Sequence, residues 1–422
     1  MKTILWFSNC IQSKGQNKAS GSWLFSMAKL LVSTGNIHLV NITKSRNKNI
    51  HKIEHAVICE RFEEYILPDW DTYNNGLPSN ENCNLVKKLC NNINPDIIHV
   101  WGVENYFSTM LPTLGLSVPL LLEIQGLQKP CSEVYYGDMT PSDIIKCFGV
   151  REILFPLKKS ICYFKKDLVN KGVIENDAIR RYRNISTQSA WIRERIRIIN
   201  RKATVYETGM SIREEFWNAK KWEYPNSIDF YCSAAGPAPY KCIQTAIKAL
   251  KTVTQYYPDV RLYVIGNFMD QNWLHQPGYL TFLKKMIKKL ELSDNVIFTG
   301  PLTANEIIDV MYKCTGMIQT SYVESYSLAV AEAQAVGVPS IISYAGAMPE
   351  LAENYKSGIF FSPGDYVSCA NKMIELIENR QLAESISNEA YRLAKERNND
   401  NTVVSKQLYI YDQIINYSKQ NG

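Results

Sequence analysis

Two carboxylates spaced eight residues apart, Glu324 and Glu332, are the side chains of this 422-residue chain whose positions most clearly suggest chemistry. A polar, turn-prone run separates them and leads into an Ala/Val/Leu-rich helix, so Glu324 precedes the helix and Glu332 lies inside it. The backbone N–H groups near Ser327 and Leu328 are then expected to be unpaired at the helix start. A helix start of this kind can hold a phosphate, while the two carboxylates reach opposite ends of the same ligand.

The segments on either side of this helix place the two carboxylates at the edge of a sheet. Cys314–Thr320 is expected to form a short buried strand, and Ser340–Tyr344 is expected to form the next one. Strand, loop, helix and strand make a βαβ unit, whose loop lies at the carboxyl end of a parallel strand. Open α/β sheets bind their ligands at this end.

Beyond the two glutamates, the wider pattern of this region resembles a known family. The pattern is similar to the donor-site signature of the retaining family 4 glycosyltransferases, or glycosyl transferases group 1. It consists of Glu324 and Glu332 with seven residues between them, the Gly-Val-Pro turn at 337–339 and the Gly-Ala-Met-Pro-Glu segment at 346–350. Two glutamates at this spacing occur by chance in many helices, but the preceding strand and the following turn make the combination specific. The resemblance implies an α/β protein with two Rossmann-like parallel-sheet domains facing a cleft, the GT-B fold.

The resemblance also implies roles on the donor side. Lys241 ends the loop after the expected strand Ile228–Ser233 and matches a lysine that grips the donor diphosphate in the family. The arginine that is usual in this loop is absent, and Cys242 replaces a glycine. Glu332 is expected to bind two ribose hydroxyls, and Glu324 is expected to orient the sugar. The expected catalytic residues are Glu324 and Lys241, and the expected donor-binding residues are Glu332, Ser325, Tyr326, Ser327, Leu328, Gly236 and Gly266.

Three places in the first half match the family less closely and are expected on the acceptor side. Gly21 and Ser22 stand where relatives have a glycine-rich loop, with a plain turn as the alternative. His99 lies near the end of a buried strand that lines the acceptor in similar proteins, and a hydrogen-bonded core or rim histidine is an equal alternative. Gln125-Gly126 stands where many relatives have His-Gly; glutamine can bind a sugar through hydrogen bonds but cannot take up a proton.

The alternation of expected strands and helices indicates two domains, which a chain of this length can support. We predict an N-terminal acceptor-side domain at 1–218, completed by a C-terminal helix at 402–422. We predict a nucleotide-sugar-binding domain at 219–401 and a linker at Trp217–Asn226. Further strands are expected at Thr3–Ser8, His38–Thr43, Pro119–Gln125, Lys202–Glu207, Arg261–Gly266 and Asn295–Gly300. Helices are expected at Leu24–Leu31, Arg151–Lys171, Trp191–Asn200, Cys242–Leu250, Tyr279–Lys289 and Ala304–Tyr312.

Composition indicates a chain without a membrane span and without a metal. No apolar run reaches the eighteen or more residues of a membrane helix, and the N-terminal segment is too short for a signal peptide. The eleven cysteines are scattered and include no Cys-x-x-Cys pair, which indicates reduced thiols in a cytosol. The five histidines are not grouped with them, and no Asp-x-Asp pair ends an expected strand, so we predict no metal and no other cofactor.

Positive charge is concentrated in one part of the chain. The net charge is +6, yet residues 151–202 alone carry fourteen Lys/Arg and only five Asp/Glu. Apolar residues are interleaved with these lysines at helical spacing, namely Ile153, Leu154, Phe155, Leu157 and Ile161. The pattern is typical of an interfacial helix on an anionic membrane, and the alternative is a helix whose apolar side faces the core. The predicted location is cytoplasmic, with peripheral contact at the inner face of the cell membrane, and no nucleic-acid partner is expected.

Together these features predict a retaining glycosyltransferase that moves a sugar from a nucleotide diphosphate donor of the UDP or GDP type. The expected acceptor is lipid-linked or an oligosaccharide, in surface polysaccharide biosynthesis. Lys241 and the helix start would stabilise the departing diphosphate, whose oxygen accepts the proton of the acceptor on the same face. Because the loop arginine is missing and Gln125 replaces a histidine, a nucleotide-binding partner subunit without transfer activity is an alternative. A nucleotide-sugar 2-epimerase is a less favoured alternative, since we do not find the several acidic residues and the histidine that such an enzyme needs in its cleft.

Overall fold

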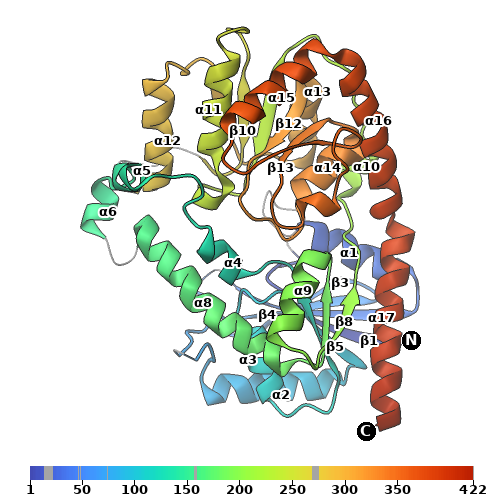
Figure 1. Cartoon of the computed structure of the whole chain (residues 1–422). Helices are drawn as coiled ribbons and strands as arrows, with labels where there is room; N and C mark the ends of the chain where they lie inside the picture. The colour runs from blue at the N-terminus through green and yellow to red at the C-terminus, as the bar shows by residue number, and fades with distance from the viewer. Residues whose placement is uncertain are drawn as a thin grey trace. The chain divides into compact units, whose positions relative to one another are not determined.

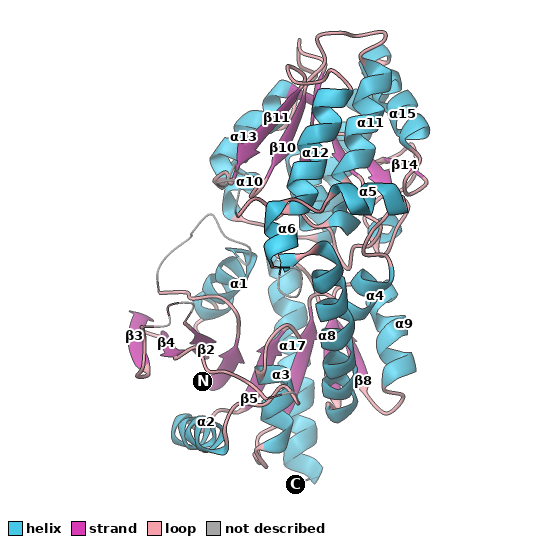
Figure 2. Cartoon of the chain, turned by 90° about the vertical axis from the view of Figure 1, so that its left-hand side faces the viewer, coloured by secondary structure: helices cyan, strands magenta, loops and turns pink. Residues whose placement is uncertain are grey.

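The structure, a computed structural model, describes residues 1–13, 22–45, 47, 49–73, 75–155, 159–268 and 275–421. The chain divides into two compact units, each a sheet covered by helices (Figures 1 and 2). Unit 1 comprises Met1–Lys129, Asn170–Ser211 and Asn398–Gly422, and unit 2 comprises Pro130–Val169 and Ile212–Arg397.

Unit 1 is built on an eight-stranded sheet in the order β3-β4-β2-β1-β5-β6-β7-β8. Its strands are β1 Lys2–Phe7, β2 Ile37–Lys44, β3 Glu54–Cys59, β4 Phe62–Leu67, β5 Ile97–Trp101, β6 Leu120–Ile124, β7 Asn184–Thr187 and β8 Thr204–Glu207. All neighbouring pairs are parallel except β3 and β4, which form an antiparallel hairpin at the edge. Leu5 of β1 pairs with Ile98 of β5, and both are fully buried, as expected for central strands covered on both faces.

The helices of unit 1 include the last helix of the chain. They are α1 Ser22–Ser33, α2 Asn80–Ile93, α3 Phe107–Met110, the 3₁₀ turn η1 Leu111–Thr113, α9 Ala190–Ile199 and α17 Asp400–Asn421. Helix α17 contacts α1 and β5, and its Tyr411 hydroxyl accepts a hydrogen bond from the indole N–H of Trp6 at 3.0 Å. The C-terminal segment is thus tied to the first sheet by a buried polar contact.

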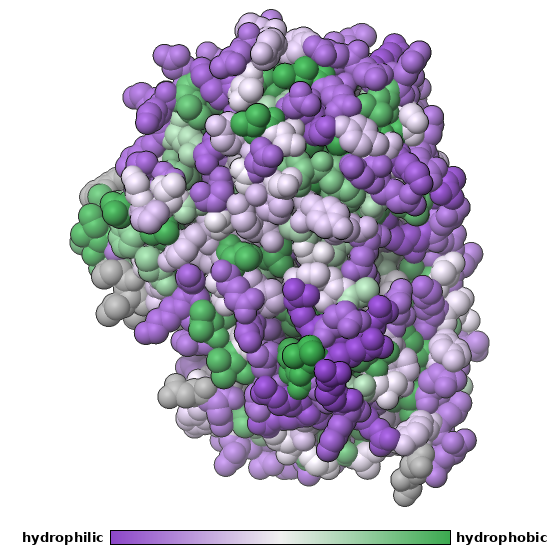
Figure 3. All heavy atoms as spheres, in the orientation of Figure 1, coloured by the Kyte–Doolittle hydropathy of each residue, from purple (hydrophilic) through white to green (hydrophobic). Residues whose placement is uncertain are grey.

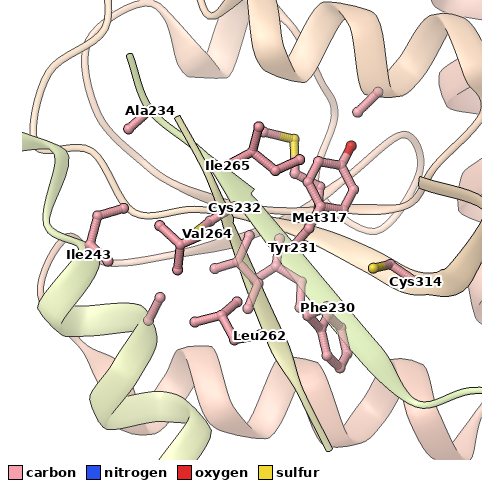
Figure 4. Close-up of a cluster of buried hydrophobic side chains, with 14 of the residues drawn as sticks. Phe230, Tyr231, Cys232, Ala234, Ile243, Leu262, Val264, Ile265, Cys314 and Met317 are labelled. Atoms are coloured by element: carbon pink, nitrogen blue, oxygen red, sulfur yellow. The ribbon is translucent and has the colours of Figure 1, made fainter. Parts of the chain in front are cut away.

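Unit 2 is built on a six-stranded parallel sheet in the order β11-β10-β9-β12-β13-β14. The strands are β9 Asp229–Ser233, β10 Leu262–Ile265, β11 Val296–Gly300, β12 Cys314–Gln319, β13 Ser340–Ser343 and β14 Ile359–Phe361. Figure 4 shows the core that these strands share, with Phe230 and Tyr231 of β9, Val264 of β10 and Met317 of β12 among the buried side chains. The confirmed fold class is therefore α/β, with two Rossmann-like parallel sheets.

Unit 2 also contains helices and 3₁₀ turns. They are α5 Pro141–Lys146, α6 Val150–Leu154, α10 Glu214–Asn218, η2 Pro239–Lys241, α11 Ile243–Val253, α12 Gly278–Lys289, α13 Ala304–Lys313, α14 Leu328–Val336, η3 Met348–Glu350, α15 Tyr366–Glu378 and α16 Arg380–Arg397. The residues of helices α4 Gln128–Glu133 and α8 Ile161–Arg181 are divided between the two units.

The compact units differ from the predicted boundaries 1–218 and 219–401 at two places. Residues 130–169 belong to unit 2, because Tyr135, Met139 and Cys147 are buried in its core. The predicted linker Trp217–Asn226 also belongs to unit 2, where the Trp222 indole is buried and donates to the Cys314 carbonyl at 2.9 Å. The chain thus enters the second unit earlier than its composition suggests.

Some elements of the structure were not predicted from the sequence. Strands β3, β4 and β7 fall in stretches where we predicted no strand. The single helix predicted at Arg151–Lys171 is interrupted, because α6 ends at Leu154 and α8 begins at Ile161; residues 156–158 lie outside the described part of the chain.

Candidate active site

Two loops meet at the carboxyl ends of neighbouring strands in unit 2. Strand β9 pairs directly with β12, and the strand order changes direction between them, with β10 and β11 on one side and β13 and β14 on the other. Ligands bind at such a switch point in open parallel sheets. The loop after β9 leads to Lys241, and the loop after β12 carries Glu324. The loops are joined by hydrogen bonds: Tyr322 N–H donates to the Tyr240 carbonyl, and the Thr320 hydroxyl donates to the Lys241 carbonyl, both at 2.9 Å.

The two predicted catalytic residues form an ion pair. Lys241 Nζ lies 2.6 Å from Glu324 Oε1. The same oxygen accepts hydrogen bonds from Gln319 Nε2 at 2.8 Å and from Ser321 Oγ at 2.7 Å. Burial disfavours the charged form of Lys241, but the Glu324 carboxylate outweighs this effect, so the pKa of Lys241 is raised and the ammonium stays charged. Oε2 of Glu324 takes part in none of these three bonds.

The backbone of Glu324 is fixed by the segment after β13. Ala347 N–H donates to the Glu324 carbonyl at 2.8 Å. Gly346 has a φ of +59°, and a Cβ at this position would lie only 2.2 Å from the Glu324 carbonyl oxygen. Only glycine fits such a close backbone approach. This explains why the Gly-Ala motif at 346–347 accompanies the glutamate in the sequence pattern.

Helix α14 begins beside this ion pair, as predicted. Ser327 is its N-cap, in an extended conformation, and its side chain forms no capping hydrogen bond. Of the other predicted donor-binding residues, Leu328 is the first helical residue and is half-buried. Ser325 and Tyr326 are also half-buried, and the Arg397 guanidinium lies 6.0 Å from the Tyr326 ring. The helix end can therefore offer backbone N–H groups to an anion.

Glu332 has a partner that the sequence did not reveal. Arg213 Nε lies 2.7 Å from Oε1, and Arg213 Nη2 lies 2.9 Å from Oε2, so the pair is bidentate. Glu332 is buried, and this burial raises the pKa of its carboxyl although Arg213 opposes the shift. The guanidinium also lies 4.6 Å from the Phe216 ring. Glu332 is thus held in a fixed orientation.

The glycines expected on the donor side occupy different environments. Gly266 has a φ of +137°, and a Cβ there would lie 1.7 Å from the Ala234 carbonyl oxygen, so this glycine allows the ends of β9 and β10 to meet. At Gly236 a Cβ would be 3.9 Å from the nearest atom, which leaves open space beside the loop. Cys242, which replaces a family glycine, adopts a left-handed conformation with φ 52°. That conformation favours glycine.

A cavity of about 650 Å³ lies within unit 1. Residues at or after the ends of β2, β5 and β6 line it, including Lys44, Glu104 and the predicted Gln125. Trp70 and Tyr106 form an aromatic wall, with ring centroids 6.3 Å apart. Removal of the Glu104 carboxyl from water by the surrounding protein raises its pKa to about 7, although the residue as a whole is exposed. Amides, a carboxyl and aromatic rings together suit a sugar.

The prediction that His99 lines the acceptor is wrong, because the side chain is fully buried. His99 Nδ1 lies 2.7 Å from the Tyr411 hydroxyl, and Nε2 lies 3.9 Å from the carboxyl of Glu123, also fully buried. Burial lowers the pKa of His99 well below its ordinary value and raises the pKa of Glu123 to about 8, so both are neutral at pH 7. Ser186 and Gln188 donate hydrogen bonds to Glu123. The core-histidine alternative is the correct one.

The remaining acceptor-side predictions give less information. Gly21 lies outside the described residues, and of Ser22 only the backbone is described, as the start of α1. Gly126 is half-buried beside Gln125. An Asp-x-Asp does follow a strand, Asp69-Trp70-Asp71 after the unpredicted β4, but Asp69 pairs with Lys44 at 2.9 Å. Over the described ranges, no group of three or more His, Cys, Asp and Glu could hold a metal ion.

Solved structures share this architecture over the full length. A sucrose-phosphate synthase from Thermosynechococcus elongatus has a TM-score of 0.72, covering 99% of this chain and 100% of that chain at 12% identity. The Anabaena protein HepE, solved with UDP and glucose, has a TM-score of 0.65, covering 98% and 100% at 16% identity. At such identities the likeness shows the fold alone, that of two Rossmann-like parallel-sheet domains.

The sequence of the second unit is similar to that of known glycosyltransferases. Residues 219–393, which include the Lys241–Glu324 pair and all of α14, match the family glycosyl transferases group 1. An N-acetyl-α-D-glucosaminyl L-malate synthase from Bacillus anthracis is 27% identical over 43% of this chain and 44% of its own length. A sulfoquinovosyl transferase from Arabidopsis thaliana is 26% identical over 35% of this chain and 27% of its own. The chain spans less than half of these two curated relatives.

Proposed function

We propose that this protein is a retaining glycosyltransferase that transfers a sugar from a nucleoside diphosphate donor to a sugar-bearing acceptor. The observation that carries the proposal is the meeting of Lys241, Glu324 and the start of α14 at the switch point of the second sheet. The family match covers the same residues. The UDP in the HepE structure and the sugar transfer in the relatives' names support a nucleotide-sugar donor of the UDP or GDP type.

In this proposal the cationic groups act on the leaving group. As the glycosidic bond breaks, negative charge grows on the diphosphate, and preorganised donors lower the barrier when they bind this charge more tightly than the intact donor. The Lys241 ammonium and the N–H groups at the start of α14 would be these donors, without a metal. The departing phosphate oxygen would accept the proton of the acceptor hydroxyl while that hydroxyl oxygen bonds to the sugar on the same face.

The two glutamates would position the donor. Glu324 keeps Oε1 for Lys241, Gln319 and Ser321, and Oε2 would accept hydrogen bonds from the sugar hydroxyls. Glu332 would bind the ribose, because each carboxylate oxygen can accept a further bond beside the one from Arg213. Arg213 would thus orient the carboxylate rather than touch the nucleotide.

The acceptor would bind in the cavity of unit 1. Trp70 and Tyr106 offer flat surfaces for a sugar ring, and Gln125 and Glu104 offer hydrogen bonds to its hydroxyls. We therefore propose an oligosaccharide or lipid-linked saccharide acceptor, of the kind used in surface polysaccharide synthesis.

A thermal-shift screen with UDP-, GDP- and ADP-sugars tests the proposal. A donor at a hundredfold excess over its dissociation constant should stabilise the protein by about 3 kcal/mol. Failure of all three nucleotide series to raise the melting temperature would contradict the proposal. Binding without any transfer to extracts of the native host would favour a partner subunit that binds nucleotide only.

A further inference from the structure

Helix α6 of unit 2 exposes its apolar side chains and buries its charged ones. Arg151 and Glu152 are 9% and 1% exposed, whereas Ile153, Leu154 and Phe155 are 69%, 55% and 43% exposed. This arrangement reverses the usual rule, because charged residues are almost never fully buried and large apolar ones usually are. An inverted pattern in so short a segment needs a specific cause.

Specific contacts hold the inverted orientation in place. Glu152 accepts hydrogen bonds from the backbone N–H of Gly278 at 2.7 Å and of Gly149 at 3.1 Å. Arg151 donates to the carbonyl of His275 at 3.2 Å. A Cβ on Gly278 would lie 1.8 Å from the Cys147 carbonyl oxygen, so α12 and the turn before α6 pack at backbone distance. The outward position of the apolar residues is therefore built into the packing of unit 2.

The exposed apolar residues form one surface, which we call the apolar tip. Its members are Ile145, Phe148, Val150, Ile153, Leu154 and Phe155. They come from α5, α6 and the residues next to them, which lie beside α12 (Figure 2). In Figure 3 hydrophobic atoms gather at the left edge, where Figure 1 places α6. Clusters of exposed apolar residues on this scale mark interaction sites.

Lysines lie on elements next to the apolar tip. Lys159 Nζ lies 4.9 Å from the centroid of the Phe155 ring. On α12, which contacts α5, Lys285, Lys288 and Lys289 are exposed. Burial raises the pKa of the Cys147 thiol to about 12, and Lys285 is close enough to oppose that rise. An apolar centre with a cationic rim is complementary to an anionic lipid surface, where acyl chains lie beneath charged headgroups.

We propose that the apolar tip inserts into the interfacial layer of an anionic bilayer while the lysine rim binds the headgroups. Since none of the described helices is long and apolar enough to cross a membrane, such contact would be peripheral. The surface is smaller than the predicted basic block at 151–202, because Arg151 is buried, as is Ile161 at 4% exposed. The docking does not depend on the proposed function. The further conclusion that the acceptor is lipid-linked rests on the proposed function.

Co-sedimentation of the full chain with vesicles tests the docking. Binding to phosphatidylglycerol vesicles is expected, with little binding to phosphatidylcholine vesicles and a decrease at high salt. The double variant Ile153→Ser/Leu154→Ser should reduce the partition coefficient by roughly tenfold or more, because it removes two exposed apolar side chains. The matched control is Val57→Ser/Ile198→Ser, since these residues are 70% and 72% exposed but lie in unit 1. The control should bind as the wild type does.

Further measurements separate the possible outcomes. Both variants should keep the wild-type melting temperature, because the substituted side chains are exposed, and nucleotide binding should be unchanged. A tryptophan placed by Ile153→Trp should shift its fluorescence to the blue with anionic vesicles only. The proposal would be overturned if the wild type did not bind anionic vesicles, or if the Ile153→Ser/Leu154→Ser variant bound them as tightly as the wild type does. A wild-type dimer that this variant converts to monomer would assign the tip to a second copy of the chain instead.

Discussion

The guanidinium of Arg213 holds both carboxylate oxygens of Glu332, at 2.7 and 2.9 Å, inside the second unit. A buried carboxylate without this partner would be an uncompensated charge. Substitution of Glu332 should therefore have two separable effects, one on folding and one on nucleotide binding.

Replacing Arg213 with glutamine should lower the free energy of unfolding by about 3 kcal/mol, because it leaves the Glu332 carboxylate buried and unpaired. Adding Glu332→Gln should restore much of this loss, since the charge is then removed as well. Urea unfolding of the two single variants and the double variant measures the coupling. Strictly additive losses would show that the pair contributes nothing to stability.

Glu332→Ala should weaken the binding of the free nucleoside diphosphate by about tenfold, because it removes a charged hydrogen-bond acceptor for the ribose. Isothermal titration at a temperature where the variant is folded measures this affinity. Glu353→Ala is the control, because it removes a carboxylate of the same unit whose side chain is 66% exposed. Equal affinities of wild type and Glu332→Ala would show that Glu332 does not bind the ribose.

Trp70→Ala should raise the KM for the acceptor by about tenfold and leave donor affinity unchanged, because the cavity wall stacks on the acceptor sugar. Tyr73→Ala offers a control, since this nearby aromatic residue is 67% exposed. Steady-state kinetics at saturating donor measure the effect. If both variants changed KM equally, or if Trp70→Ala changed donor affinity instead, the cavity would not be the acceptor site.

The buried Glu123 should make stability fall as pH rises. Its pKa is about 8 in the folded state and near 4.5 in the unfolded chain, so the folded state retains a proton that the unfolded state loses. The contribution is therefore present at low pH and is lost as pH rises through about 8. Between pH 6.5 and 8.5 the wild type should lose about 2 kcal/mol more than Glu123→Gln, whose amide does not titrate. Parallel pH profiles from urea unfolding would contradict this assignment.

The second sheet and the donor loops could be predicted because their signals are local. Strands β9 and β12 are buried apolar runs, and Glu324, the start of α14 and Gly346 follow β12 within one βαβ unit. Arg213 could not be found in this way. It lies 119 residues before Glu332, and only the packing of α10, which follows Arg213, against α14 brings the two together.

The first unit was harder to interpret for related reasons. The pattern around His99 fits a ligand-binding strand as well as a core strand, and its partner Tyr411 is 312 residues away. Strand β3 is an exposed edge strand, with Val57 70% exposed, so it lacks the apolar run of a buried strand. The aromatic wall of Trp70 and Tyr106 comes from two separate loops. Only the fold brings these side chains together.

The most direct test of the account is the rate of sugar transfer by wild type and Glu324→Gln, measured as nucleoside diphosphate released in the presence of a glycolipid extract of the native host. The glutamine keeps the size of the side chain but removes the charge that orients the sugar and pairs with Lys241. We predict release by the wild type with at least one UDP- or GDP-sugar. In the variant the rate should fall by roughly tenfold or more, at nearly equal nucleotide affinity. Equal rates in the two proteins, or no release by a wild type that binds the donor, would contradict the account.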